Sequence, residues 1–399
     1  MRFHVVSLPH TQTTKAYNAC AYTEKVRKFC NMMKSLGHEV FLYAGEENEA
    51  FVDELITCVT KEEQKVWFKN NDFTKNFFNI TWGADDPHWV SMNGRAISAI
   101  QSRLKYEPIH RKGKTEMVSK DFICLIGGNC QKMIADAFPA ITSVEFGIGY
   151  TGVFSKFRVY ESYAWMHYVH GTLNDDNGHF FDAVIPNYFE LEDFPFCKWK
   201  EPYYLYLGRM VSRKGLEMAS ETVKRIGGKL ILSGQGVLQN SPGKIVTKEI
   251  TLEGDHLEYV GYADVKKRAD LLGHARAVFV ETSYLEPFGG VAVEAQLCGT
   301  PVITTDWGAF PETVLHGVTG YRVRYIGESM AAAIKAKSLD PHTIRKWAAD
   351  NFSTKRVRFM YETYFKNLLM LWDEGWYTDD MPLDGLDRFK KYYPFPNKV

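Results

Sequence analysis

The chain has 399 residues, more than one hydrophobic core usually organises, so we expect two domains. Hydrophobic residues make up 45% of the chain and charged residues 24%, which excludes a disordered or collagen-like protein. Basic and acidic residues both number 48, so the formal charge is zero and no overall field attracts nucleic acid or anionic lipid. We therefore predict no stable nucleic-acid partner.

The N-terminal segment and the cysteines indicate a cellular compartment. The first apolar run ends at Pro9, which makes it too short for a signal peptide or a membrane span. Seven cysteines without a Cys-x-x-Cys pair argue against a disulfide framework or a zinc site. These features predict a cytoplasmic protein without a transmembrane segment. A peripheral membrane contact and the oligomeric state are left open.

The first half begins as strand, helix, strand, the unit of a doubly wound parallel sheet. Residues 3–8 form an apolar run, residues 15–36 have apolar side chains at helical spacing, and residues 40–43 are apolar again. Residues 122–126 and 140–144 are further candidate strands. The aromatic residues in the segment 61–120, which precedes these two strands, are expected to belong to the core, with an acceptor platform as the alternative. They are Trp67, Phe68, Phe73, Phe77, Phe78, Trp82 and Trp89.

The second half has a clearer alternation of strands and helices. Residues 203–207, 229–233, 257–260, 277–280 and 302–305 are short apolar strands, and residues 216–226, 264–272 and 291–298 are helical. This alternation predicts a second parallel sheet. We place a first domain at residues 1–195, a second at 196–350, and a C-terminal helix and tail at 351–399 that cross back to the first domain.

Two carboxylates frame the strongest motif, which spans residues 286–301. Glu286 lies in a loop, Gly289 and Gly290 open a helix, and Glu294 lies within that helix. The start of a helix presents unpaired backbone N–H groups and the positive end of the helix dipole, which together bind phosphate. The flanking carboxylates can accept hydrogen bonds from hydroxyl groups. The motif therefore predicts a site for a nucleotide sugar.

A basic motif follows the strand at residues 203–207. Arg209 and Lys214 come after the carboxyl end of this strand, where open parallel sheets bind ligands. A guanidinium group can bind a pyrophosphate through two parallel hydrogen bonds, and the lysine adds a point charge.

Residues 201–327 resemble the donor domain of retaining glycosyltransferases of family 4, in the GT-B superfamily. The likeness runs through five motifs in order, at residues 206–215, 232–236, 259–262, 286–301 and 306–320. It implies an α/β fold in which two Rossmann-like, doubly wound parallel-sheet domains face each other across a cleft. It also implies retention of anomeric configuration, with a UDP- or GDP-sugar as donor, an unidentified acceptor hydroxyl, and neither a metal nor another cofactor.

The resemblance assigns roles position by position. Arg209 and Lys214 would hold the donor diphosphate, Glu286 would contact the transferred sugar, and Glu294 would bind the ribose hydroxyls. Further donor contacts are expected at Gly234, Tyr262, Phe288, Gly289, Gly290 and Val291.

The first domain departs from the family pattern. Relatives often carry a histidine beside the donor sugar after a middle strand, whereas Glu145 follows the candidate strand at residues 140–144 here. We take Glu145 as the candidate catalytic group from this domain. His10, Thr11, Thr14 and His170 are the candidates for the acceptor side.

Two other functions remain open from the sequence. One is a GT-B enzyme that hydrolyses or epimerises its nucleotide sugar, and the other is a sugar-nucleotide-binding protein without activity. The spacing of the two glutamates disfavours the first, and the intact set of Arg209, Lys214, Glu286 and Glu294 disfavours the second.

Overall fold

The computed structural model describes residues 1–69, 80–111 and 113–372. The chain divides into a unit of residues 1–358 and a unit of residues 359–399, and the fold and the site described below lie in the first. The predicted tail at 373–399 and three of the aromatic residues, Phe73, Phe77 and Phe78, lie outside the described residues. The predicted return of residues 351–399 to the first domain stays a prediction. Within the described part of the chain, no helix is long and apolar enough to cross a membrane.

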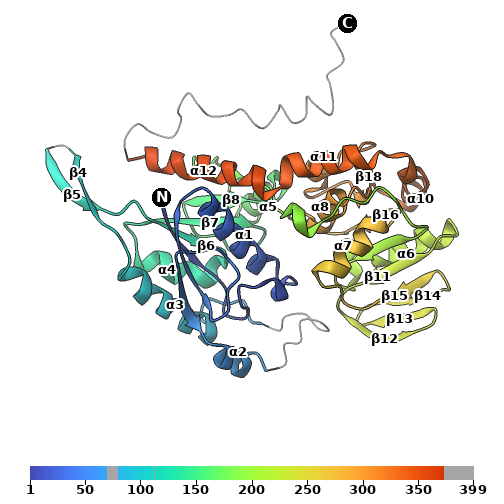
Figure 1. Cartoon of the computed structure of the whole chain (residues 1–399), viewed down its shortest axis with the longest axis horizontal. Helices are drawn as coiled ribbons and strands as arrows, with labels where there is room; N and C mark the ends of the chain where they lie inside the picture. The colour runs from blue at the N-terminus through green and yellow to red at the C-terminus, as the bar shows by residue number, and fades with distance from the viewer. Residues whose placement is uncertain (70–79, 112, 373–399) are drawn as a thin grey trace, which may run out of the picture. The chain divides into compact units, whose positions relative to one another are not determined.

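The first sheet has seven parallel strands in the order β3-β2-β1-β6-β7-β8-β9, of which Figure 1 labels β6, β7 and β8. Their bounds are β1 (Arg2–Val6), β2 (Glu39–Gly45), β3 (Glu54–Val59), β6 (Phe122–Leu125), β7 (Thr142–Ile148), β8 (Phe157–Tyr160) and β9 (Ala183–Val184). The connecting helices are α1 (Ala21–Ser35), α2 (Lys61–Trp67), α3 (Pro87–Gln101), α4 (Lys132–Ala137) and α5 (Tyr163–Thr172). A separate antiparallel hairpin consists of β4 (Glu107–Arg111) and β5 (Lys114–Val118).

The second sheet has six parallel strands in the order β15-β11-β10-β16-β17-β18. Their bounds are β10 (Tyr204–Leu207), β11 (Leu230–Ser233), β15 (Leu257–Tyr259), β16 (Ala277–Val280), β17 (Val302–Thr305) and β18 (Gly320–Val323). Its helices are α6 (Leu216–Arg225), α7 (Val265–His274), α8 (Gly290–Leu297), α9 (Phe310–Thr313), α10 (Ile326–Lys335) and α11 (Pro341–Phe352). The last helix, α12 (Thr354–Met370), begins in the unit of residues 1–358 and continues into the unit of residues 359–399. A small antiparallel sheet adds β12 (Val237–Ser241), β13 (Lys244–Thr247) and β14 (Thr251–Glu253).

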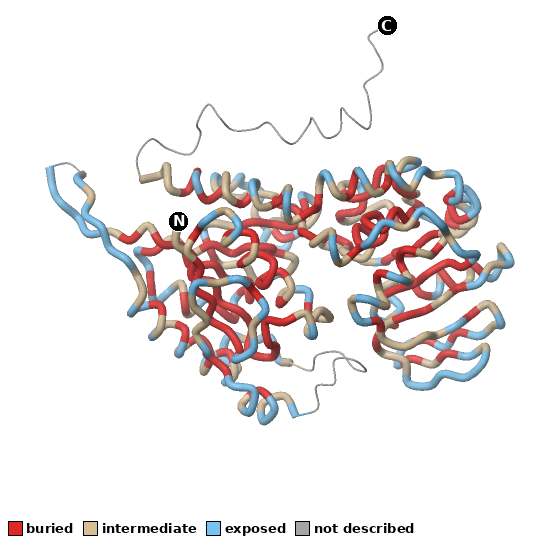
Figure 2. The backbone as a smooth tube through the Cα atoms, in the orientation of Figure 1, coloured by how far each residue is buried: buried red, intermediate tan, exposed pale blue. Residues whose placement is uncertain are grey.

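Buried strands form the centre of both sheets, as the red segments of Figure 2 show. The first half buries side chains of β1, β2 and β6 against α3 and α4, whereas the second buries β10, β11 and β16 against α6 and α10. Short apolar runs without alternation are typical of strands that are covered on both faces. Two separate parallel sheets confirm the fold class predicted from the sequence.

Both sheets reverse their direction of winding next to their first strand. In the first sheet β1 lies between β2 and β6, and in the second β10 lies between β11 and β16. Loops that leave the carboxyl ends of such neighbouring strands diverge to opposite faces, which opens a crevice for a ligand. The fold therefore provides one such crevice in each half.

Candidate active site

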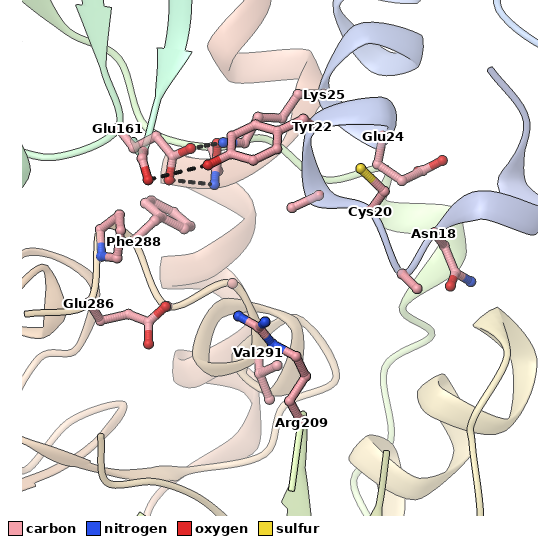
Figure 3. A pocket seen from close by; sticks show the side chains of 18 of the residues that line it. Asn18, Cys20, Tyr22, Glu24, Lys25, Glu161, Arg209, Glu286, Phe288 and Val291 are labelled. Atoms are coloured by element: carbon pink, nitrogen blue, oxygen red, sulfur yellow. Dashed lines mark hydrogen bonds and ion pairs between the residues drawn. The ribbon is translucent and has the colours of Figure 1, made fainter. Parts of the chain in front are cut away.

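A cavity of about 1240 Å³ is lined by residues from both halves of the unit of residues 1–358. The first half contributes residues that follow β1, β6, β7 and β8, and the second half contributes residues that follow β10, β11 and β16. The two crevices thus share one cavity. Figure 3 shows Arg209, Glu286, Phe288 and Val291 of the second half across from Tyr22, Lys25 and Glu161 of the first.

The start of helix α8 provides a backbone site for an anion. Gly289 is the N-cap residue with φ +78°, and no described side chain caps this end of the helix. A Cβ atom on Gly289 would lie 2.5 Å from Cε1 of Phe310, so this position requires glycine. The N–H groups at the start of the helix, before that of Ala292, which donates to the carbonyl of Gly289, are therefore available to a ligand, and Gly289, Gly290 and Val291 all line the cavity.

Glu294 lies one turn further along α8 and has capacity for another hydrogen bond. Its Oε1 accepts a hydrogen bond of 3.2 Å from Nη1 of Arg268 on α7. Its Oε2 is buried and has no hydrogen-bond partner among the described residues. A buried carboxylate oxygen without a partner is costly, so this atom is suited to accept a hydrogen bond from a bound hydroxyl.

Glu286 forms an ion pair with Lys214. The Lys214 Nζ atom lies 3.2 and 2.9 Å from the two carboxylate oxygens of Glu286, and the hydroxyl of Tyr284 donates a third bond of 2.6 Å. Burial, together with the charge of Glu286, raises the pKa of Tyr284, so this phenol keeps its proton. The motifs at 208–215 and 286–301 were predicted separately, and the ion pair between Lys214 and Glu286 brings them together.

Cations exceed carboxylates on the second-half side of the cavity. Among the described residues that line it from residue 204 onward, the cations are Arg209, Arg213, Lys214 and Arg268, and the carboxylates are Glu286 and Glu294. The Arg213 guanidinium lies 4.7 Å from the ring centre of Tyr284, next to Lys214. The surplus of positive charge favours a ligand with at least two negative charges.

Close backbone packing positions Arg209. Gly234 has φ +147°, and a Cβ atom there would lie 1.7 Å from the carbonyl oxygen of Gly208. The two loops can approach this closely only because Gly234 has no side chain. Tyr262 also lines the cavity, and its hydroxyl donates a 2.6 Å hydrogen bond to Oδ1 of Asn18 in the first half.

Glu161 brings a buried carboxylate into the cavity from the first half. It follows β8, forms an ion pair with Lys25 of α1, and accepts a 3.1 Å hydrogen bond from Nδ2 of Asn187. The side chains of Glu161 and Lys25 are 4% and 8% exposed, and both residues line the cavity.

Hydrogen bonds across the cavity hold the segment that follows Glu161 against the second half. The Ser162 hydroxyl donates a 2.7 Å bond to the carbonyl of Pro287. The carboxylate of Glu312 accepts bonds of 2.9 Å from each of two backbone N–H groups at the start of α5, those of Tyr163 and Ala164. Glu161 is therefore held near the loop that carries Glu286.

The structure corrects the placement of Glu145. The strand predicted at 140–144 is β7 (Thr142–Ile148), so Glu145 lies inside the strand rather than at its end. Its carboxylate is fully buried and accepts bonds from the hydroxyl of Tyr150 and the N–H groups of Phe154 and Ser155, at 3.1, 2.8 and 2.7 Å. Burial raises its pKa. Glu145 stabilises the loop that follows β7 and does not line the cavity.

Of the four acceptor-side candidates, only His10 lines the cavity. Burial lowers the pKa of His10 to about 3, so its ring is neutral. Thr11 and Thr14 are buried away from the lining, and the Thr11 hydroxyl pairs with that of Thr23 at 2.5 Å. His170 lies near the end of α5 and pairs with Asp182 at 3.0 Å. The structure does not bring these last three side chains to the cavity.

Among the described aromatic residues of the segment 61–120, two lie in or against the core and one lines the cavity. Trp89 is 1% exposed and Trp67 packs against the core, as expected. Trp82 is 46% exposed and lines the cavity, which agrees with the alternative.

Sequence reasoning missed Glu161, Lys25, Arg213 and Arg268. The available signal for Glu161 is its place directly after a strand, but the short run at β8 (Phe157–Tyr160) does not predict a strand from the sequence alone. Arg213 lies inside the predicted basic motif. Lys25 and Arg268 lie on helices with ordinary amphipathic patterns, and no sequence signal distinguished them from solvent-exposed charges.

Comparison with known proteins finds similarity concentrated in the second half. Residues 192–349 match the family model described as glycosyl transferases group 1. A glycogen synthase of Mycobacterium tuberculosis is 32% identical over 151 residues, 36% of this chain and 36% of that protein. The capsular polysaccharide biosynthesis glycosyltransferase CapM of Staphylococcus aureus is 30% identical over 178 residues, 40% of this chain and 46% of that protein. The matches thus span between a third and a half of these relatives.

Solved structures resemble the chain over nearly its whole length. A sucrose-phosphate synthase from Thermosynechococcus elongatus has a TM-score of 0.63 at 16% identity and covers 93% of this chain and 100% of its own. HepE of Anabaena, solved with UDP and glucose, has a TM-score of 0.57 at 14% identity, with 92% and 99% covered. At these identities the likeness shows a shared fold.

Proposed function

Because residues 192–349 match the family model of the glycosyl transferases group 1 and the chain has the GT-B fold, we propose that this protein is a glycosyltransferase. It transfers a sugar from a nucleoside diphosphate sugar to the hydroxyl of an acceptor. The observation that carries the proposal is the start of α8, where backbone N–H groups, the four described cations of the second half and Oε2 of Glu294, which has no partner among the described residues, line one cavity. A diphosphate with an attached ribose matches this combination of charge and hydrogen-bond acceptors.

The donor is a UDP- or GDP-sugar in this proposal. Support comes from HepE, solved with UDP, and from the Staphylococcus aureus protein TarM, solved with UDP at a TM-score of 0.56 and 10% identity. Glu294 would accept hydrogen bonds from the ribose hydroxyls, and Tyr262 would lie near the base. Gly234 and the backbone of 288–291 would contact the diphosphate and the sugar.

Transfer proceeds with retention and without a metal ion. The bond between the anomeric carbon and the diphosphate oxygen breaks, the acceptor oxygen bonds to the same face of that carbon, and the acceptor proton passes to the departing diphosphate. Arg209 and Lys214 stabilise the charge that grows on the leaving diphosphate. Glu286, held by Lys214 and Tyr284, faces the transferred sugar. These residue roles are supported by the position of all of these groups in one cavity. Because the reaction needs no metal ion in this proposal, a chelator is expected to leave the rate unchanged.

A thermal-shift experiment with UDP, GDP, UDP-glucose and GDP-mannose tests the donor assignment. A ligand at a hundred times its dissociation constant adds about 2.7 kcal/mol to the free energy of unfolding. We expect the melting temperature to rise with one of the two nucleotides and its sugar, and the rise to shrink in Glu294→Gln. If neither nucleotide raises the melting temperature of the wild-type chain, the proposal is wrong.

The product distribution without an acceptor separates a transferase from an epimerase or a hydrolase. We expect the transferase to consume the donor only slowly, whereas complete conversion of the donor would indicate one of the alternatives.

The cytoplasmic location stays a prediction, and it agrees with the seven cysteines, all of which are free and six of which are buried.

A further inference from the structure

The first half lines the cavity with a wall of aromatic and hydrogen-bonding side chains that the donor does not require. We call it the N-terminal wall and define it by Tyr22, Lys25, Trp82, Tyr150, Glu161 and Trp165, all of which line the cavity. They come from α1, from the segment before α3, and from the segments after β7 and β8.

The polar part of this wall offers both donors and acceptors of hydrogen bonds. Glu161 is a buried acceptor between the ammonium group of Lys25 and the amide of Asn187. Lys25 also donates a 3.0 Å bond to the carbonyl of Gly147, which fixes its position. Neighbouring hydroxyls of a sugar act both as donor and as acceptor, so they can bond to such a carboxylate and amide together.

The aromatic part of the wall is continuous. The ring of Tyr22 lies 5.7 Å from that of Trp82 and 5.9 Å from that of Tyr150, in edge-to-face arrangements. Trp82 is 46% exposed although it is a large apolar side chain, so part of its ring is available for contact. The negative face of an aromatic ring attracts the weakly positive C–H groups on the face of a pyranose.

The charges of this wall do not favour a phosphate. Among the described lining residues of the first half, Lys25 and Lys28 are the two lysines, and Lys25 is paired with Glu161 while Lys28 lies 3.5 Å from Glu24. His10 adds no charge, because burial keeps its ring neutral. The opposite wall, in contrast, has four cations against two carboxylates. An anionic group therefore binds better at the donor wall than here.

The geometry places this wall beside the reacting centre. Ser162, the residue after Glu161, donates a hydrogen bond to Pro287, the residue after Glu286. Figure 3 shows Glu161 and Tyr22 on the side of the cavity that faces Phe288 and Glu286. A group bound at the N-terminal wall would thus lie next to a sugar held by Glu286.

We propose that the N-terminal wall is the acceptor subsite and that it binds an uncharged sugar ring, with Glu161 positioning the hydroxyl that is glycosylated and Trp82 stacking on the ring. This inference rests on the proposed glycosyltransferase function. It excludes a sugar phosphate and a simple lipid alcohol as the group that occupies the subsite.

The test measures release of nucleoside diphosphate from UDP-glucose or GDP-mannose, whichever stabilises the wild-type chain. The added acceptors are methyl α-glucoside, maltose, glucose 6-phosphate and 1-octanol. We expect release to be stimulated by a neutral saccharide and not by the phosphate or the alkanol. Trp82→Ala should raise the KM for the saccharide about 10-fold, as expected for the loss of one stacking contact. Glu161→Gln should lower kcat for transfer to the saccharide.

A control variant and a measurement of nucleoside diphosphate binding distinguish a loss of acceptor binding from a general loss of folding or of donor binding. The matched control is Phe51→Ala, since Phe51 is 72% exposed and does not line the cavity, and it should behave as the wild type. Calorimetry should give nearly unchanged affinity for the nucleoside diphosphate in Trp82→Ala and Glu161→Gln. The inference is overturned if no neutral saccharide stimulates release, if glucose 6-phosphate or octanol does so better, or if both variants match Phe51→Ala. If the nucleoside diphosphate does not bind at all, the proposed function itself fails.

Discussion

At the scale of single residues, Glu286 and Glu294 are chemically identical and lie in one segment, yet their surroundings differ. Both oxygens of Glu286 are engaged by Lys214, and one also by Tyr284. Glu294 keeps one oxygen without a partner among the described residues. We therefore expect the two carboxylates to respond differently to the same substitution.

The Glu294→Gln variant should bind the nucleoside diphosphate about 10-fold more weakly, because one of two acceptor oxygens for the ribose becomes a donor. The Glu286→Gln variant should bind it with nearly normal affinity and lose about 100-fold in kcat, because its partner is the sugar in the transition state. Calorimetry and steady-state rates measure the two effects. Glu62→Gln, at a side chain that is 80% exposed, is the control. Equal losses of diphosphate affinity in both variants would refute this division of roles.

The cations of the donor wall should affect binding and turnover together. Arg209→Ala or Lys214→Ala should slow transfer by about 100-fold, the typical effect of removing a preorganised charge that faces a leaving group. Lys224→Ala changes an exposed lysine of α6 and should have no effect. Normal kinetics in both cavity variants would show that the diphosphate binds elsewhere.

Glu281 should make the stability of the chain depend on pH. It is 3% exposed, it accepts a 2.5 Å bond from the hydroxyl of Ser329, and burial raises its pKa from 4.5 to about 8. Between these values the folded chain keeps the proton and the unfolded chain loses it, so the folded state is favoured most at the acidic end. Stability should fall as the pH rises through this window, by about 1 kcal/mol per pH unit.

Chemical denaturation of the wild type and of Glu281→Gln measures this effect. The amide cannot ionise, so the variant should lose this pH dependence while the rest of the profile is kept. The same slope in both proteins would show that Glu281 is ionised in the folded chain.

At the scale of elements, the N-cap residue of helix α8 matters for both folding and ligand binding. Gly289 needs a positive φ and has the ring of Phe310 against it. Gly317 has nearly the same φ, +76°, but nothing lies within 4 Å of its Cβ position. The two glycines therefore separate backbone strain from steric clash.

Gly317→Ala should cost about 1 kcal/mol of stability, from the left-handed backbone alone. Gly289→Ala should cost about 3 kcal/mol, because overpacking against Phe310 adds to the same strain. Only Gly289→Ala should weaken binding of the nucleoside diphosphate. Thermal unfolding and calorimetry give the two quantities, and equal destabilisation by both variants would contradict the clash.

At the scale of the unit of residues 1–358, the side chains of Glu312 and Ser162 link the two halves beside the site. Glu312 of the second half accepts bonds from the first N–H groups of α5, and Ser162 bonds to Pro287. Asp340 plays the same capping role at α11 but acts on its own half, through the N–H groups of His342 and Thr343. Enzymes with such clefts close them to exclude water from the reaction.

Glu312→Ala should increase the radius of gyration of the ligand-free protein and weaken the decrease that a bound nucleotide sugar causes. Asp340→Ala should lower stability to a similar degree, by about 1 kcal/mol, without changing the radius. Small-angle scattering measures the first effect and thermal unfolding the second. If both variants leave the radius unchanged, the Glu312 contact does not control closure.

Several residues of the second half that the sequence singled out do line the cavity, and they could be found because their determinants are contiguous. Gly289, Glu286 and Glu294 lie within one loop and one helix, so local spacing determines their arrangement. Arg209 and Lys214 follow a strong apolar strand, and the ends of parallel strands meet at one edge of the sheet. The two antiparallel pieces, β4–β5 and β12–β14, were missed because their strands are short and largely exposed, without the apolar pattern of the parallel strands.

Only the tertiary structure decided which residues of the first half reach the cavity. Glu145 and Glu161 are both buried glutamates, but Glu145 lies inside β7, whereas Glu161 directly follows the end of β8. Strand ends depend on pairing with neighbours far along the chain, which a single sequence does not specify. The partner of Glu161 is Lys25 on α1, brought to it by the order of strands in the sheet. The arrangement of motifs made of neighbouring residues could therefore be predicted from the sequence alone, whereas contacts between distant segments depend on how the two sheets pack.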